Sequence, residues 1–125
     1  MNKTYTLLLL PLFTMALTPT VFAAVTATKT QTELDRHTAV SQQKAELALD
    51  KAYLQLMTSL EAEQHAPLEK AQKAWLTFRD AQAEFRSTTF AGGSIQPLVY
   101  NEALTELTQQ RTQQLDRLFQ EQVGY

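Results

Sequence analysis

The sequence has no cysteine, and among its 125 residues it has only 3 glycines, 1 tryptophan and no excess of positive charge. The absence of cysteine excludes a disulfide-stapled scaffold and a zinc site built on thiolates. A nucleic-acid binder usually carries a basic stripe, whereas this chain has 11 Lys and Arg residues against 13 Asp and Glu residues. The length suits one small domain held together by packing alone, and it is too short for a two-domain enzyme.

The first 23 residues are typical of a secretory signal peptide. Lys3 supplies a positive charge, an apolar run over residues 6–17 follows, and small residues at Val21 and Ala23 suit a cleavage site. The run is shorter than the about 20 apolar residues that a membrane span requires, so an uncleaved anchor is the less favoured alternative. We therefore expect a periplasmic or secreted protein without stable membrane insertion after cleavage. Loss of Lys3 takes the formal net charge from −2 to −3.

Beyond the signal peptide, the apolar spacing predicts helices and no strand. Residues 24–30 are rich in Ala and Thr without periodic apolar positions, so we expect a flexible lead-in before a helical domain over residues 31–125. Residues 31–64 contain neither Gly nor Pro and predict one long first helix. Its wide apolar stripe combines two rows, which are Leu49, Tyr53, Leu56 and Leu60, and Val40, Leu47 and Leu54.

A proline indicates where the second helix begins. Pro67 is predicted to open this helix after a joint at His65 and Ala66, because the first helical turn does not need the N–H that proline lacks. The helix should end near Arg86. Its recurring positions place the large rings on one face, and they are Leu68, Ala71, Trp75, Phe78, Gln82 and Phe85.

A loop over residues 87–96 is the only substantial interruption before a third helix. Gly92 and Gly93 stand in the middle of this loop, and Pro97 opens the last helix, whose apolar positions continue close to Gly124. Three amphipathic stripes that each need cover predict an all-α fold. We expect a small, mostly antiparallel three-helix bundle with one long first helix.

Three separated motifs in the second half of the chain form a recognisable series. They are Gln72-x-x-Trp75-x-x-Phe78-Arg79-Asp80, then Gly92-Gly93-Ser94-Ile95 with Pro97 and Tyr100, then Leu107-Thr108-x-x-Arg111-Thr112-x-x-Leu115. This series closely resembles the LprI-like lysozyme inhibitor family of bacterial envelope proteins, and Leu49-Asp50-x-x-Tyr53 is similar to that family's first-helix pattern. The resemblance implies the fold more strongly than the activity.

The chain departs from the family pattern in its lack of cysteines. Members commonly carry cysteines in the first helix, shortly after the Arg-Asp pair, and after the Tyr of the third segment. The last two positions correspond to Ala83 and Ala103, while Arg36 or His37 stands near the first. If those cysteines form bridges in relatives, this chain lacks about 2–4 kcal/mol of stabilisation per bridge.

The motif residues other than the loop are predicted to serve the bundle itself. Trp75 is expected in the core, and Arg79, Asp80 and Arg111 are expected to form interhelix ion pairs. A guanidinium stacked on the indole of Trp75 is the alternative for Arg79. The complete set of these structural motif residues is Gln72, Trp75, Phe78, Arg79, Asp80, Tyr100, Thr108, Arg111 and Thr112.

The loop is the candidate contact with a partner. Glycine permits close approach, while a hydroxyl and an apolar side chain supply contacts, so such a loop could enter an enzyme's groove. The predicted partner-binding residues are Gly92, Gly93, Ser94, Ile95 and Gln96. The alternative is that the two glycines only end the second helix and turn the chain.

Catalysis, metal binding and a cofactor have little support in the sequence. The carboxylate pairs Asp80 with Glu84 and Glu102 with Glu106 are four residues apart, a spacing common on wet helix surfaces. The two histidines lie far apart without ligand spacing, and no nucleophile motif is present. We therefore expect neither an enzyme nor a cofactor.

Two functions are compatible with these observations. The first, implied by the resemblance, is an exported binding protein that blocks a lysozyme or other muramidase by a stoichiometric protein–protein contact. The alternative is an envelope helical interaction module with a non-lysozyme partner. The oligomeric state stays open, because an apolar strip left by unequal helices could be covered by a second copy.

Overall fold

The computed structural model describes the backbone of residues 20–124 and the side chains of residues 30–124. Three helices follow one another, α1 (Thr20–Ser59), α2 (Ala62–Ser87) and α3 (Gln96–Val123), with a short 3-10 helix η1 (Thr88–Phe90) after α2. The predicted all-α three-helix fold is confirmed. The predicted signal peptide lies mostly outside the described residues, and its boundary at residue 23 stays a prediction.

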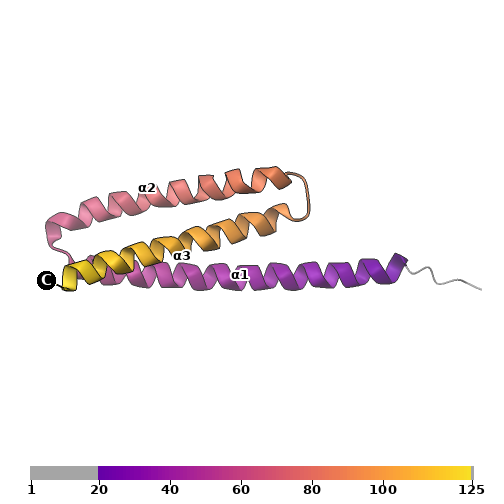
Figure 1. Ribbon diagram of the computed structural model, residues 1–125, viewed down its shortest axis with the longest axis horizontal. Coiled ribbons are helices and arrows are strands. Elements are labelled where there is room, and N and C mark those ends of the chain that lie inside the picture. The colour runs from indigo at the N-terminus through magenta and orange to yellow at the C-terminus, as the bar shows by residue number, and fades with distance from the viewer. Residues whose placement is uncertain (1–19, 125) are drawn as a thin grey trace, which may run out of the picture.

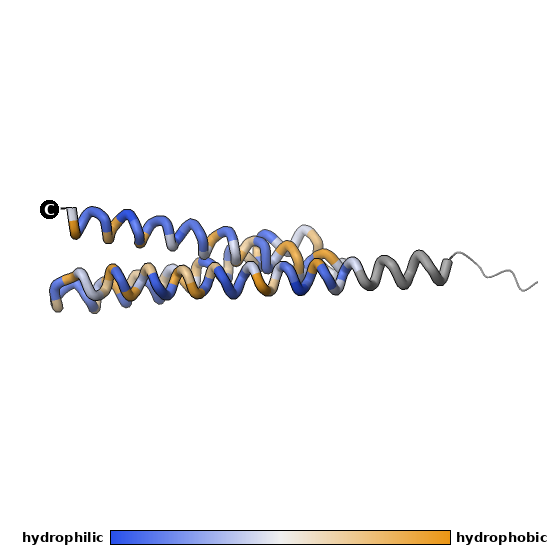
Figure 2. The backbone as a smooth tube through the Cα atoms, turned by 90° about the horizontal axis from the view of Figure 1, so that it is seen from below, coloured by the Kyte–Doolittle hydropathy of each residue, from blue (hydrophilic) through white to orange (hydrophobic). Residues whose placement is uncertain are grey.

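The helices form an up-down-up bundle. Figure 1 shows that α2 runs antiparallel to both of its neighbours in sequence, whereas α1 and α3 run in the same direction. The parallel pair α1 and α3 packs together most closely, and α2 packs mainly on α3. The N-terminal part of α1 extends beyond the loop that joins α2 and α3 (Figure 1). Apolar and polar positions alternate along the helices, as amphipathic helices in a small bundle require (Figure 2).

Helix α1 begins earlier and ends earlier than the sequence predicts. It includes residues 24–30, for which the sequence predicted a flexible lead-in, and this segment contains no Gly or Pro to interrupt a helix. It ends at Ser59 rather than at residue 64. No helix in the part of the chain described by the structure is long and apolar enough to cross a membrane.

The predicted apolar stripe of α1 is half correct. The row containing Leu49 and Leu56 is buried, whereas Val40, Leu47 and Leu54 are exposed, and prediction of the second row as core is wrong. Leu47 is 63% exposed and Leu49 only 2%, although they are two residues apart. Two residues along an α-helix correspond to a rotation of about 200°, so the two rows lie on opposite faces.

Helix α2 begins before its proline, so the predicted joint at His65 and Ala66 is wrong. The chain turns at Leu60 and Glu61 instead, and Pro67 lies inside the helix. The turn ahead of the proline is closed by two bonds: the Gln64 N–H donates to the Glu61 carbonyl at 2.9 Å, and the Glu61 N–H donates to the Gln64 side chain at 3.3 Å. The helix tolerates Pro67 here because Glu63, whose carbonyl the proline cannot bond, is an exposed residue that water can reach.

The later boundaries agree with the sequence. Helix α2 ends at Ser87, one residue beyond the predicted Arg86. Pro97 stands in the first turn of α3, which ends at Val123 next to Gly124. Proline and glycine are therefore reliable boundary signals in this half of the chain.

The core consists of two clusters of different composition. The first lies toward the α1–α2 turn, and its buried members are Leu49, Ala52, Leu56 and Leu115, packed against Tyr53, Leu60, Leu68, Trp75 and Phe119. The second lies toward the loop between α2 and α3. It consists of Ala83, Ala103 and Leu104 with Tyr100 packed against them.

Candidate functional site

Two of the nine structural motif residues, Arg79 and Arg111, place their guanidiniums over the indole ring of Trp75, and three others, Gln72, Asp80 and Thr108, bond these guanidiniums. This half-buried ring belongs to α2 and packs against the first core cluster. The Cζ atom of Arg79 lies 5.5 Å from the ring centroid, and that of Arg111 on α3 lies 5.8 Å from it. Both guanidiniums are close enough for a cation–π interaction. The structure therefore supports core packing for Trp75 and stacking for Arg79 together.

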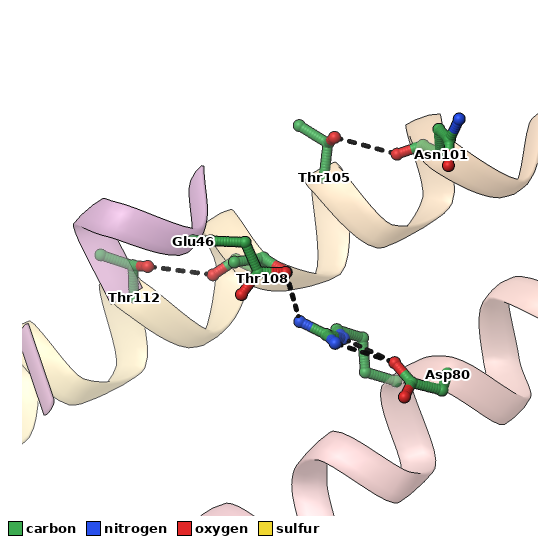
Figure 3. Close-up of polar contacts among 7 residues, drawn as sticks. Glu46, Asp80, Asn101, Thr105, Thr108 and Thr112 are labelled. Carbon is green, nitrogen blue, oxygen red and sulfur yellow. Dashed lines mark hydrogen bonds and ion pairs between the residues drawn. The ribbon is translucent and has the colours of Figure 1, made fainter. Parts of the chain in front are cut away.

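Arg79 connects all three helices. Its Nη1 lies 2.7 Å from Glu46 Oε1 on α1 and donates to the Thr108 hydroxyl on α3 at 3.3 Å. Its Nε donates to Asp80 Oδ1 at 2.9 Å within α2. Figure 3 shows Glu46, Asp80 and Thr108 converging from these three helices. With its side chain only 11% exposed, Arg79 fixes the relative positions of the helices through a forked, permanently charged group.

Thr108 and Thr112 lie one turn apart on α3 and are held by different partners. The Thr112 hydroxyl donates to the Thr108 carbonyl at 3.0 Å, and Thr108 is itself buried (Figure 3). A buried hydroxyl needs a partner, and for Thr108 that partner is the Arg79 guanidinium. Glu46, which completes the interhelix ion pair with Arg79, was not among the residues named from the sequence.

Arg111 is held by neutral partners. Its Nε donates to the Gln72 side chain at 3.0 Å, and its Nη1 donates to the Gln114 side chain at 3.2 Å. No carboxylate of the described residues pairs with it, so the predicted ion pair of Arg111 is wrong. Burial lowers the pKa of Arg111 from its ordinary value, and arginine nevertheless stays charged.

Two motif residues lie outside this cluster. Phe78 is 54% exposed on the outer face of α2, so the prediction that Trp75 and Phe78 share one face is wrong. Tyr100 packs against the second core cluster near the loop. The ring positions of α2 therefore divide between two faces.

The predicted partner-binding loop is exposed and internally bonded. The Gly92 N–H donates to the Gln96 side chain at 3.0 Å, and the Gly93 N–H donates to the Phe90 carbonyl at 2.9 Å. Gly92 has a φ of +76°, a conformation that side chains rarely adopt. Residues 88–95 are all exposed, and Phe90 and Ile95 present apolar side chains to solvent. The glycines thus shape a turn and leave its outer surface free.

The sequence reasoning missed a groove between α1 and α2. The groove measures about 560 Å³, and its lining residues are Glu46, Leu49, Asp50, Tyr53, Glu69, Gln72, Lys73 and Leu76. Burial, and then the charge of Glu69, raises the pKa of Tyr53. The signal in the sequence was the four-residue spacing of Glu46 and Asp50 on one helix and of Glu69 and Lys73 on the next. These pairs place three carboxylates and one ammonium group around a groove whose lining is otherwise mainly apolar.

Three of the other titratable candidates have structural partners. Glu106 Oε2 lies 2.8 Å from Arg86 Nη2, joining α3 to α2, and Asp80 pairs with Arg79. His65 Nε2 lies 3.2 Å from the Leu60 carbonyl at the α1–α2 turn. Within residues 30–124, no three His, Cys, Asp or Glu side chains are placed to hold a metal ion.

Comparisons with known proteins agree with the motif series. The family model described as "Lysozyme inhibitor LprI" matches residues 23–115. An uncharacterized protein of Rhizobium meliloti is 42% identical over 53 residues, which cover 42% of this chain and 38% of that relative. The chain thus matches less than half of this relative's length. No solved structure matches the chain.

Proposed function

Since the chain belongs to the LprI family of lysozyme inhibitors, we propose that it binds a lysozyme or another muramidase and blocks it. The contact is made by the loop residues Gly92, Gly93, Ser94, Ile95 and Gln96, in a one-to-one complex. The protein acts after export, in the periplasm or outside the cell, as the N-terminal sequence predicts. Because the family is described as one of inhibitors, membership supports a binding role for this chain.

The observation that carries this proposal is the bonded, exposed loop. Four turn bonds join its residues, including Ala91 N–H to the Thr88 carbonyl at 3.0 Å and Gln96 N–H to the Gly93 carbonyl at 3.2 Å. A loop already held in one conformation loses little entropy when it binds. Ile95 and Phe90 supply apolar contact area, and Ser94 supplies a hydroxyl.

The mechanism requires only exclusion of substrate. A muramidase binds its polysaccharide in a groove, and a rigid loop backed by two helices can occupy such a groove without any chemical step. A few central contacts carry most of the binding energy in interfaces of this type. The acidic groove and the net negative charge favour a cationic partner by steering its approach.

The test is an inhibition titration with loop variants. The protein is expressed from its full coding sequence, purified in the form that the cell yields, and titrated into a peptidoglycan-clearing assay with lysozymes of several classes. We expect saturation near one-to-one with at least one class. Gly93→Trp and Ser94→Arg should accelerate dissociation, since interface changes act mainly on the off-rate. Gln113→Arg, an exposed change on α3, is the matched control.

Circular dichroism separates misfolding from loss of contact. A folded Ser94→Arg variant that inhibits as well as the parent removes the loop from the proposal. Absence of both inhibition and binding heat across the whole panel, from folded protein, removes the muramidase itself.

One observation favours a second candidate, an envelope interaction module with another partner. Most motif residues behind the family resemblance contact one another, so they account for the shared fold without requiring a shared target. This candidate predicts that Trp75→Ala and Leu107→Ala lower the free energy of unfolding by about 2–5 kcal/mol. It also predicts that the loop variants change neither stability nor cell phenotype.

A further inference from the structure

The outer face of α2 carries a continuous apolar row that the monomer does not cover. Its members recur at alternating steps of four and three residues and all are exposed; they are Pro67, Ala71, Ala74, Phe78, Ala81 and Phe85. Phe78 is 54% exposed and Phe85 70%. Alternating steps of four and three give the average repeat of 3.5 residues that defines the seam between two coiled helices.

This seam is separate from the face that α2 uses in its own bundle. The inward face carries Gln72, Arg79 and the buried Ala83. The seam residue Phe78 is only one position from Arg79, but a single step turns the helix by about 100°. The rotation places a second amphipathic face on the outside of α2, where two benzyl groups are exposed on one row.

The charges beside the seam identify its occupant. Lys70 and Lys73 flank the N-terminal half, whereas Asp80 and Glu84 flank the C-terminal half of the same side. The pattern is balanced about Thr77, with Lys70 seven residues before it and Glu84 seven residues after it. All of these side chains are exposed. A surface that is positive at one end and negative at the other complements a second copy of itself in the opposite direction.

We propose that two copies of this chain associate through α2 in an antiparallel, two-fold symmetric pair centred near Thr77. Lys70 of one copy then lies opposite Glu84 of the second copy, and the reverse pair forms at the other end. A parallel pair would instead align like charges. The interface is isologous, so it closes at two copies and does not extend into a fibre.

The same register matches large side chains to small ones. With Thr77 near the axis, Phe78 of each copy faces Ala74 of the other, and Phe85 faces Pro67. Ala71 and Ala81 meet between them. A large knob over a small residue is the packing that allows two helices to approach closely.

The pair leaves the loops free for a different partner. Because the two α2 helices point in opposite directions, the loop that follows each helix lies at the opposite end of the pair from its counterpart. The inference does not depend on the identity of the loop's target. It predicts that any such target binds two to a pair.

The test is the mass of the protein as a function of concentration, measured by sedimentation equilibrium on the chain purified in the form that the cell yields. We expect twice the monomer mass at high concentration and dissociation on dilution. Phe78→Gln and Phe85→Gln should each raise the dissociation constant at least tenfold while the helical circular dichroism stays unchanged. Leu47→Gln is the matched control, because the exposure of Leu47, 63%, lies between those of Phe78 and Phe85 and this residue lies on α1.

A charge exchange tests the direction of the pair. Lys70→Glu alone should weaken the dimer at least tenfold, and Lys70→Glu combined with Glu84→Lys should restore it. A dimer that Lys70→Glu leaves unchanged indicates parallel helices, in which one like-charge pair merely replaces another, and contradicts the proposed pair. A protein that is monomeric from micromolar to millimolar concentration overturns the proposal. So does a folded Phe85→Gln variant whose only defect is weaker binding to a muramidase.

Discussion

The two ends of the bundle are built from different side chains. At the end near the α1–α2 turn, leucines from two helices are buried together, and Trp75 and Phe119 pack on them. At the loop end, Ala83 and Ala103 meet with only Leu104 and Tyr100 around them. Because buried apolar area is the main source of stability, the first end stabilises the fold more than the second. The loop end instead brings two helices close together behind an exposed turn.

The largest expected loss of stability comes from truncating a leucine in the core cluster near the α1–α2 turn. Leu115→Ala should lower the free energy of unfolding by about 4 kcal/mol, because its neighbours are large and cannot collapse into the cavity. Leu104→Ala should cost about 2 kcal/mol, since its surroundings are smaller and closer to solvent. Urea denaturation measures both. Leu54→Ala, at a position that is 60% exposed, is the control with an expected change below about 0.5 kcal/mol. Equal losses at Leu115 and Leu104 would contradict the comparison.

A designed disulfide should raise the stability of the loop end, which is the less stable end of the bundle. Ala83 and Ala103 are buried in one cluster where α2 meets α3, and this chain lacks cysteine. The double variant Ala83→Cys with Ala103→Cys should oxidise and raise the free energy of unfolding by about 3 kcal/mol. Denaturation with and without reductant isolates the bridge, and the single variant Ala83→Cys is the control. Thiols that stay free under oxidising conditions would show that these positions are too far apart.

Between the two ends, Arg79 ties the three helices together. Arg79→Leu should lower the free energy of unfolding by about 2 kcal/mol, because it leaves Glu46 and the buried Thr108 hydroxyl without a partner. Arg86→Leu, which breaks the more exposed pair with Glu106, should cost less than about 1 kcal/mol. Thermal unfolding in low and high salt compares the two. Similar losses of stability in both variants would contradict the role of Arg79 in connecting the three helices.

The smallest effects are expected in the loop itself. Gly92→Ala should cost about 1–2 kcal/mol, because a residue with a side chain is strained at a φ of +76° even though its Cβ would meet no neighbouring atom within 4 Å. Gly93→Ala should lower the free energy of unfolding by less than about 1 kcal/mol, since its φ is not positive and its Cβ would meet only the Phe90 carbonyl, at 3.2 Å. Chemical denaturation of both variants measures the difference. A Gly92→Ala variant as stable as the parent would show that the turn can adopt another shape.

The fold was predictable where residue type limits the backbone directly. The row through Leu49 and Leu56, Pro97 at the start of α3 and the end of α2 near Arg86 all follow from periodicity and from proline and glycine chemistry. The predicted start of α2 at Pro67 was wrong, because a helix can begin a turn before a proline when the carbonyl that the proline cannot bond is open to water. The core prediction was wrong for Val40, Leu47 and Leu54, because a seven-residue spacing fits a helical repeat on the exposed face as well as on the buried one.

The site was predictable only in part. The motif series identified Trp75, Arg79 and Thr108, and the structure brings their side chains together. Glu46 was not predictable, because an ion pair between residues 33 positions apart depends on the helix register. The groove between α1 and α2 depends on how closely these helices pack, which the amphipathic pattern of each helix alone does not determine.

Amide hydrogen exchange on the chain, alone and with a lysozyme that it inhibits, tests the central claim most directly. The account predicts that the slowest exchange in the free chain lies around Leu56 and Leu115. It also predicts that the lysozyme protects residues 88–96 and leaves the groove residues Asp50 and Glu69 unchanged. Protection of the groove without protection of the loop would contradict the account, and so would protection of neither.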